Sequence, residues 1–179
     1  MVAQRRIQKE LAKWSQNPIP RIEFRTNQQN IFQLDIWITP VETSPYFGAS
    51  YNFRVSLPVE YPRKSPKINC VTPIYHHAIM EDKCDCLDLS DRIKDYWFPV
   101  LTLSKIAQIL CLLVDYPLES DLGLNCEDCP IYQETLTHPE NYIKKAREYM
   151  LDHVYELRNH RPCFIRLTKG KECIICRLS

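Results

Sequence analysis

The stretch Ile74-Tyr75-His76-His77-Ala78-Ile79, followed shortly by Cys84-Asp85-Cys86-Leu87-Asp88, is the part around which the rest of the sequence is organised. Helical or alternating patterns lie on either side of it, whereas the stretch itself has neither period. Prolines precede it at positions 58, 62, 66 and 73, and proline excludes helix and central-strand pairing where it stands. We therefore expect residues 74–100 to be mostly irregular and to contain the one cysteine that does chemistry.

The overall composition is that of an ordinary globular protein. The 179 residues are 45% hydrophobic and 25% charged, with a net charge of +1, which suits one main domain and no nucleic-acid partner. The most apolar run, residues 106–114, is far shorter than the roughly 20 residues that cross a bilayer. Because the first residues also lack a secretory signal, we expect a cytoplasmic and/or nuclear protein with no membrane partner.

Nine cysteines would suggest a disulfide framework in a small secreted chain. Here the count is odd, the chain is larger and a signal is missing, so free thiols in a reducing compartment are expected. Most of them should act simply as small apolar residues.

The chain before the central stretch predicts one helix. Ile7, Leu11 and Trp14 recur at i, i+4 and i+7 among charged residues, which indicates an amphipathic helix ending near Asn17-Pro18. Its polar face should be exposed.

From Arg21 onward the period of the apolar residues changes to two. Alternation over residues 32–38 and 51–57 predicts two half-buried strands, and a third around residues 67–71 completes a short antiparallel meander.

Two helices are predicted after the central stretch. The first follows the potential caps Thr102 and Ser104 and is stopped by Pro117. The second begins with the capping-box spacing of residues 137–140 and buries one side, on which Tyr142, Ala146, Tyr149, Met150 and Val154 lie.

Several local motifs accompany this order of elements. In chain order they are Arg6-Ile7-Gln8-Lys9-Glu10-Leu11, Ser44-Pro45-Tyr46-Phe47-Gly48, Glu60-Tyr61-Pro62-Arg63-Lys64-Ser65-Pro66-Lys67-Ile68, Ile74-Tyr75-His76, Cys86-Leu87-Asp88, Trp97-Phe98-Pro99-Val100-Leu101-Thr102-Leu103-Ser104 and Ala146-Arg147-Glu148. Together they resemble the ubiquitin-conjugating (E2) enzyme family. The resemblance implies an α+β UBC-like fold over residues 1–157, with an N-terminal helix, an antiparallel β-meander and C-terminal helices. Residues 158–179 would then be a C-terminal extension, which we expect to be flexible.

The resemblance also implies a chemistry. Members of the family accept ubiquitin or a similar modifier from an activating enzyme (E1) as a thioester, then pass it to a lysine or to a ligase (E3). It places the nucleophilic thiol at Cys86, with Cys84 as the fallback, and implies no cofactor and no metal.

The sequence departs from the family beside this thiol. The His-Pro-Asn motif reads His76-His77-Ala78, so a methyl group replaces the amide that stabilises the oxyanion during lysine attack. Losing one such donor costs about 2.7–4 kcal/mol in acyl transfer. His77 is a weak substitute donor, the alternative being a turn residue that fills the place of the proline. Asp85 makes the neighbourhood acidic, which should raise the pKa of the Cys86 thiol.

The family also keeps an acidic residue that positions and deprotonates the incoming lysine. Asp121 lies near that position, and Glu119 competes for the role because the loop is longer here. Solvated loop charge is the alternative for both.

Partner surfaces follow from the same resemblance. The residues that correspond to the first-helix and two loop positions that contact E1 or E3 are Arg5, Arg6, Lys9, Arg63, Pro99 and Val100. Arg63 replaces the phenylalanine that is common in members serving HECT ligases, so a RING ligase is the expected partner.

Two other functions stay open. A non-catalytic E2-like adaptor that binds ubiquitin or a partner E2 would explain the missing asparagine, although such adaptors usually lack the cysteine that this chain keeps. The pairs Cys126-x-x-Cys129 and Cys173-x-x-Cys176 could in principle form a zinc site, but their long separation argues against it.

Overall fold

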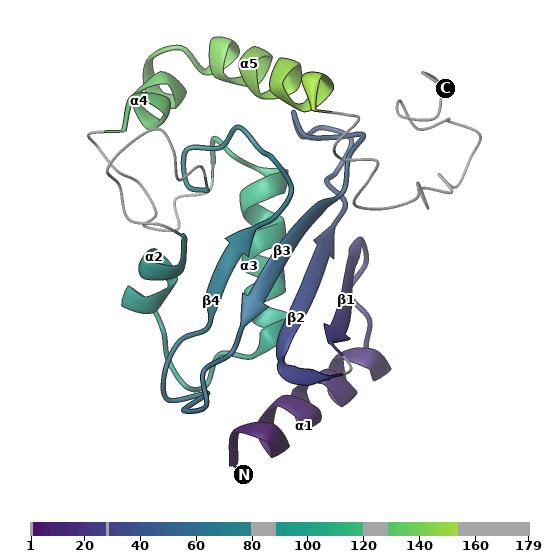
Figure 1. Ribbon diagram of the computed structural model, residues 1–179. Coiled ribbons are helices and arrows are strands. Elements are labelled where there is room, and N and C mark those ends of the chain that lie inside the picture. The colour runs from purple at the N-terminus through teal and green to yellow at the C-terminus, as the bar shows by residue number, and fades with distance from the viewer. Residues whose placement is uncertain (1, 28, 80–88, 120–128, 154–179) are drawn as a thin grey trace, which may run out of the picture.

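The computed structural model describes residues 2–27, 29–79, 89–119 and 129–153 (Figure 1). The helices and strands are, in order, α1 (Val2–Gln16), β1 (Ile22–Asn27), β2 (Asn30–Ile38), β3 (Tyr51–Ser56), β4 (Lys67–Cys70), α2 (Leu89–Asp95), α3 (Leu103–Asp115), α4 (Pro130–Thr137) and α5 (Pro139–Asp152). The four strands form one antiparallel sheet in the order β1-β2-β3-β4. This confirms the predicted α+β class with an N-terminal helix, a β-meander and C-terminal helices.

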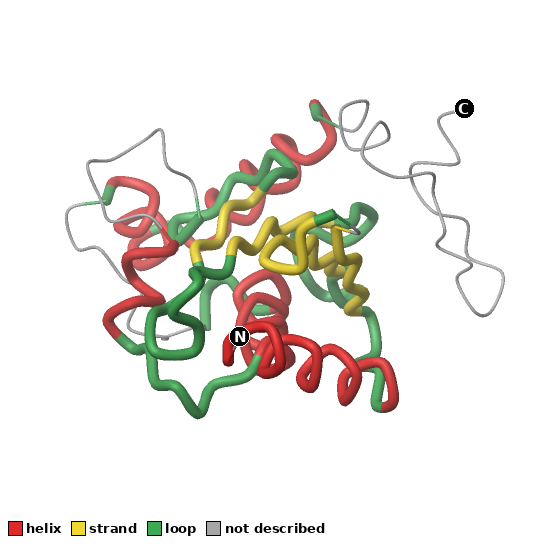
Figure 2. The backbone as a smooth tube through the Cα atoms, turned by 60° about the horizontal axis from the view of Figure 1, so that its bottom comes forward, coloured by secondary structure: helices red, strands yellow, loops and turns green. Residues whose placement is uncertain are grey.

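One face of the sheet carries the core. Ile36 on β2 lies opposite Phe24 on β1 and Phe53 on β3, and both Ile36 and Phe53 are fully buried. Figure 2, in which the sheet is seen nearly edge on, shows α1 and α3 on the same side of it. The apolar stripes that the sequence predicted for these helices therefore meet the even-numbered face of β2.

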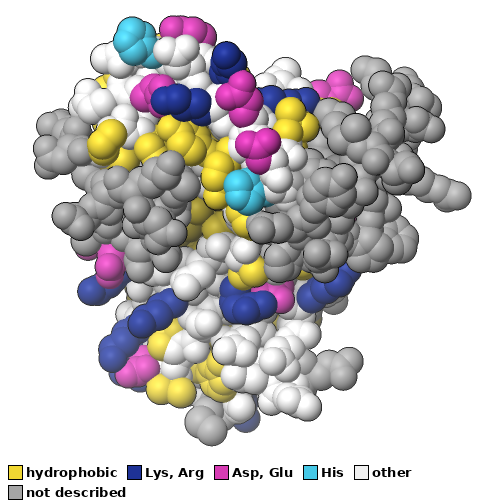
Figure 3. Space-filling view, turned by 45° about the horizontal axis from the view of Figure 1, so that its top comes forward, with side chains coloured by type: hydrophobic (Ala, Val, Ile, Leu, Met, Phe, Trp, Pro, Cys, Tyr) yellow, Lys and Arg dark blue, Asp and Glu magenta, His cyan; other side chains and the backbone are white. Residues whose placement is uncertain are grey.

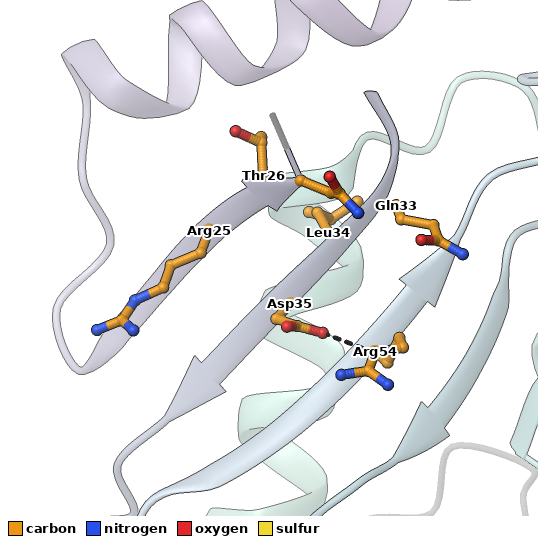
Figure 4. Close-up of a pocket in the computed structure, with 7 residues that line it drawn as sticks. Arg25, Thr26, Gln33, Leu34, Asp35 and Arg54 are labelled. Atoms are coloured by element: carbon orange, nitrogen blue, oxygen red, sulfur yellow. Dashed lines mark hydrogen bonds and ion pairs between the residues drawn. The ribbon is translucent and has the colours of Figure 1, made fainter. Parts of the chain in front are cut away.

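The opposite face of the sheet is polar. Arg25, Asp35 and Arg54 are opposite one another on β1, β2 and β3, and Asp35 forms an ion pair with Arg54 at 3.1 Å (Figure 4). A hollow of about 460 Å³ lies beside these residues. The one acid in its lining, Asp35, is paired with Arg54, and the guanidinium of Arg25 lies 6.0 Å from the centre of the Trp37 ring.

Three elements differ from the sequence prediction. The sheet has a fourth strand, β1, and residues 74–100 are not uniformly irregular, because α2 occupies Leu89–Asp95. Helix α4 was also not predicted. Both helices have eight residues or fewer, too short for a 3.6-residue period to be visible in the sequence, and such helices depend on their neighbours for stability.

The helix caps agree with the prediction at one end and disagree at another. The hydroxyl of Thr102 accepts a hydrogen bond from the Lys105 amide and caps α3, as predicted. The prediction of a capping box at residues 137–140 is wrong. The Thr137 hydroxyl instead donates to the Gln133 carbonyl at 2.8 Å, within the last turn of α4. Since α4 runs directly into α5, that hydroxyl is already used by the preceding helix.

The buried side of α5 is confirmed at Tyr142, Ala146 and Met150, whereas Val154 lies outside the described residues. Within the described ranges, none of the helices is both long enough and apolar enough to cross a membrane.

Candidate active site

Residues 74–79 are irregular, as predicted, and every one of them is buried. The hydroxyl of Tyr46 donates to the Tyr75 carbonyl at 2.6 Å and lies 2.8 Å from the hydroxyl of Tyr142 on α5. Burial raises the pKa of Tyr46 well above its usual value, so this phenol stays a donor. The segment is thus held by the loop after β2 and by the last helix.

His76 connects the turn at residues 76–79 to α3 through hydrogen bonds. Its Nδ1 accepts a hydrogen bond from the amide of Ala78 at 3.0 Å, and its Nε2 lies 3.0 Å from the Leu113 carbonyl. Because a carbonyl only accepts, Nε2 carries the hydrogen and Nδ1 is free to accept, which defines one neutral tautomer. This histidine therefore has a structural use for both ring nitrogens.

His77 is also packed into the fold. Its Nε2 donates to the carbonyl of Pro117 at 3.0 Å, and its ring lies 4.8 Å from that of His76 and 5.4 Å from that of Tyr132. The side chain is 5% exposed. This placement is what a turn residue replacing proline would require, and the oxyanion role of His77 stays a prediction.

Ala78 closes the same turn and is 3% exposed. Its methyl group is part of the hydrophobic core, and it supplies no hydrogen-bond donor beyond the backbone. The position at which the family has an asparagine amide is therefore apolar in this chain.

Helix α2 anchors the other end of the cysteine segment. Leu89 is buried, and the hydroxyl of Ser90 accepts from the Ile68 amide at 2.8 Å while donating to the Ile68 carbonyl at 3.0 Å. Both polar groups of one residue of the edge strand β4 are thus satisfied by a single side chain.

The predicted nucleophile Cys86, its fallback Cys84, the acidic neighbour Asp85 and the proposed lysine-positioning Asp121 lie outside the described residues. Glu119, the competitor of Asp121, is exposed on the turn after α3, where its amide donates to the Tyr116 carbonyl. The described part of the chain contains no cluster of metal-ligating residues, and Cys129 is a buried free thiol there.

The sequence model of the family described as ubiquitin-conjugating enzyme matches residues 6–150. This chain belongs to the ubiquitin-conjugating enzyme family. The match begins within α1, covers the whole sheet and ends within α5, so it includes both segments that flank Cys86. As an E2, the chain belongs to a class of transferases whose general partners are ubiquitin, an activating enzyme and a ligase. The domain boundary near residue 157 stays a prediction.

The structure brings together the three segments that carry the predicted partner residues of this E2. The guanidinium of Arg6 on α1 donates to the Pro99 carbonyl at 3.3 Å, and the indole of Trp97 donates to the Pro62 carbonyl at 2.8 Å. The exposed side chains on this surface are Arg5, Lys9, Arg63, Pro99 and Val100. The E1 and E3 partners of these residues stay a prediction.

Two residues, one on this E2 surface and one buried beneath it, were not singled out by the sequence. Phe98 is 64% exposed next to Val100, and an aromatic ring in that position adds apolar area to the surface. Glu10 lies on the buried stripe of α1, and its carboxylate accepts from the Tyr61 hydroxyl at 2.9 Å and from the Leu103 amide at 2.8 Å. An acid three residues after Ile7 on an apolar stripe was the signal that could have identified Glu10.

Proposed function

We propose that this E2 carries ubiquitin or a ubiquitin-like modifier as a thioester on Cys86 and passes it to an E3 or, slowly, to a lysine. The observation that carries the proposal is the match of residues 6–150 to the family, within which Cys86-Leu87-Asp88 lies between two firmly held segments. On one side the His76 turn is bonded to α3, and on the other Ser90 is bonded to β4. A nucleophilic thiol needs this kind of support from rigid elements.

In this proposal, the buried methyl group of Ala78 slows the transfer of the modifier from Cys86 to a lysine. Attack by a lysine amine develops charge on the thioester oxygen, and a missing donor slows such steps by about 10²–10³. Transfer to another thiol should suffer less in this proposal, because the thiolate is the better nucleophile. We therefore favour transthiolation, or assistance from a RING ligase, over unaided lysine discharge.

The test is incubation of the full chain with activating enzyme, ATP and ubiquitin, and with other modifiers in parallel, without reductant. We expect an adduct that reductant removes, that Cys86→Ala abolishes and that Cys84→Ala retains. If Cys84→Ala abolished the adduct and Cys86→Ala retained it, the thioester would be assigned to Cys84 instead. Such chemistry belongs in a reducing compartment, so cytoplasmic and/or nuclear action is part of the proposal.

A non-catalytic adaptor is the second candidate, and the observation that favours it is the apolar environment of Ala78. An adaptor would form no adduct with any modifier while still binding ubiquitin or a partner E2. Titration of isotope-labelled ubiquitin with the chain, followed by NMR, detects such binding without any transfer.

A further inference from the structure

A groove of about 910 Å³ lies between the loop that joins β3 to β4 and helix α2. Pro58 and Trp97 supply apolar parts of its lining, and Asn69 and Ser90 supply polar parts. Four cationic side chains also line it, and all of them are exposed: Arg63, Lys64, Lys67 and Lys94. In Figure 3, Lys and Arg side chains are gathered at the lower left, the side on which Figure 1 places β4 and α2.

The charge of this groove is poorly balanced. Asp91 is the one acid in its lining, and Lys64 is paired with Glu60 at 2.8 Å outside it. Among the described residues, no ion pair engages Arg63, Lys67 or Lys94. Three cations that have no ion pair within residues 2–27, 29–79, 89–119 and 129–153 thus lie on one concave surface, which favours an anionic ligand.

Helix α2 covers the outer edge of β4 at Ile68, beside the groove. The two bonds between Ser90 and Ile68 hold α2 against β4 and occupy the outward backbone groups of Ile68. The groove offers its side chains for recognition, and long lysines beside apolar lining residues suit the carboxylates of a flexible segment.

We propose that this groove binds an acidic, Asp- and Glu-rich segment of a partner protein. The C-terminal extension of the chain is a poor occupant, because residues 158–179 contain one acid, Glu172, among many cations. Those cations are Arg158, Arg161, Arg166, Lys169, Lys171 and Arg177. The cationic groove and the cationic extension repel each other.

The groove also lies next to the proposed nucleophile in the sequence. Ser90 follows Cys86 by four residues, and four residues of extended chain span at most about 14 Å. A substrate with an acidic segment near its target lysine would be held close to the thioester by this groove. That consequence rests on the proposed function, whereas binding of the segment does not.

The test measures binding directly, by fluorescence anisotropy of a labelled oligoglutamate peptide with the full chain. We expect binding that weakens with salt and that is absent for an oligoglutamine peptide of the same length. The double variant Lys67→Glu/Lys94→Glu should bind at least about tenfold more weakly. Both residues are exposed, so its thermal unfolding should match that of the parent chain.

The matched control is Lys13→Glu/Lys105→Glu, which makes the same change of net charge at exposed positions away from the groove. It should keep the affinity within about twofold. The proposal would be overturned if both double variants lost affinity equally, or if the oligoglutamine peptide bound as tightly as the oligoglutamate peptide. So would equally tight, groove-dependent binding of a single-stranded oligonucleotide, which would make this a general polyanion site. A thioester assay that fails while the peptide still binds would count against the proposed function alone.

Discussion

Ala78 places a methyl group where the family motif has an asparagine, and the structure shows that methyl packed in the core. The two preceding histidines use their Nε2 atoms to hold carbonyls of α3 and of the turn that follows it. These three residues therefore shape the backbone of the turn, and the side chain at position 78 offers no hydrogen-bond donor.

Restoring that donor should restore lysine transfer if the proposed function holds. We expect Ala78→Asn to raise discharge of the thioester onto free lysine by about tenfold or more, because one oxyanion donor accounts for about 10²–10³ in rate. Single-turnover discharge assays measure this. Ala12→Asn, on the exposed side of α1, should change nothing. Unchanged discharge in a folded Ala78→Asn variant would refute the role of this position.

Cys111 should be an unreactive thiol. It is 7% exposed, and burial, followed by the nearby Asp115 carboxylate, raises its pKa to about 11. Because the thiolate is the reactive form, alkylation by iodoacetamide near neutral pH should be at least about a hundredfold slower in the folded chain than in urea. Timed labelling with peptide mass spectrometry measures both rates, and similar rates would contradict the packing of this residue.

At the scale of elements, the two short helices are defined by their contacts. Helix α2 packs against β4 through Ser90, and α4 is tied to its surroundings by Glu134, which accepts from Tyr75 at 3.1 Å and pairs with Lys145 at 2.6 Å. Neither helix has enough residues to be stable by itself. Their positions next to the cysteine segment and beside residues 120–128 make these anchors relevant to the site.

Removing the Ser90 hydroxyl should loosen α2. In Ser90→Ala the buried amide and carbonyl of Ile68 lose their partner, at a cost of about 1–3 kcal/mol in the free energy of unfolding. Urea titration measures the cost, and hydrogen exchange should show faster loss of protection at the Ile68 amide. Ser15→Ala, at an exposed position of α1, is the control and should be neutral. Unchanged exchange at Ile68 would show that α2 is held by other contacts.

Glu134 should make the free energy of unfolding depend on pH in the acid range. Its hydrogen bond to Lys145, and less so that to Tyr75, lowers the pKa of Glu134 below its usual 4.5. A carboxyl with a lowered folded pKa stabilises the fold above the unfolded pKa, and this stabilisation is lost as the pH falls through the folded value.

The comparison that isolates this effect is Glu134→Gln, which can still accept from Tyr75. The parent chain should exceed the variant by less than about 1 kcal/mol near neutral pH, because Lys145 is half exposed. That difference should shrink and then disappear as the pH falls below 4.5 and through the lowered pKa of Glu134, as followed by thermal unfolding across the acid range. A difference that persists in acid would point to lost packing instead of lost charge.

At the scale of the whole molecule, Glu10 joins parts that are far apart in the sequence. Its carboxylate accepts from Arg6 on its own helix, from Tyr61 before β4 and from the first amide of α3. An acid at a helix N-terminus is favourable because the first amides of the helix lack partners. This one side chain holds together the three segments of the predicted partner surface.

Glu10→Ala should therefore destabilise the fold by about 2–4 kcal/mol, because it leaves the Tyr61 hydroxyl and the Leu103 amide buried without an acceptor. Urea unfolding measures the loss. Glu148→Ala, at an exposed position of α5, should change stability by about 0.5 kcal/mol or less. A small effect of Glu10→Ala would mean that water replaces the carboxylate at this junction.

The sequence by itself determined the elements with a clear period. Apolar residues that recur every 3.6 positions predict α1, α3 and the buried side of α5, and those that recur every two positions predict β2, β3 and β4. This works because the buried face of a helix or strand is set by the spacing of nearby residues. The family also follows from local motifs. The choice of Cys86 as nucleophile comes from the same kind of local signal and lies outside the described residues.

Only the tertiary structure decided what the polar residues of the fold do. Glu10 meets Leu103 across 93 positions, His77 meets Pro117 across 40, and Ser90 meets Ile68 across 22. No local period encodes such pairs, because each depends on how distant elements pack, and the same holds for the short helices α2 and α4. The stretch around His76 was recognisable from its residues, but its burial and its bonds to α3 arise from the packing of the whole fold.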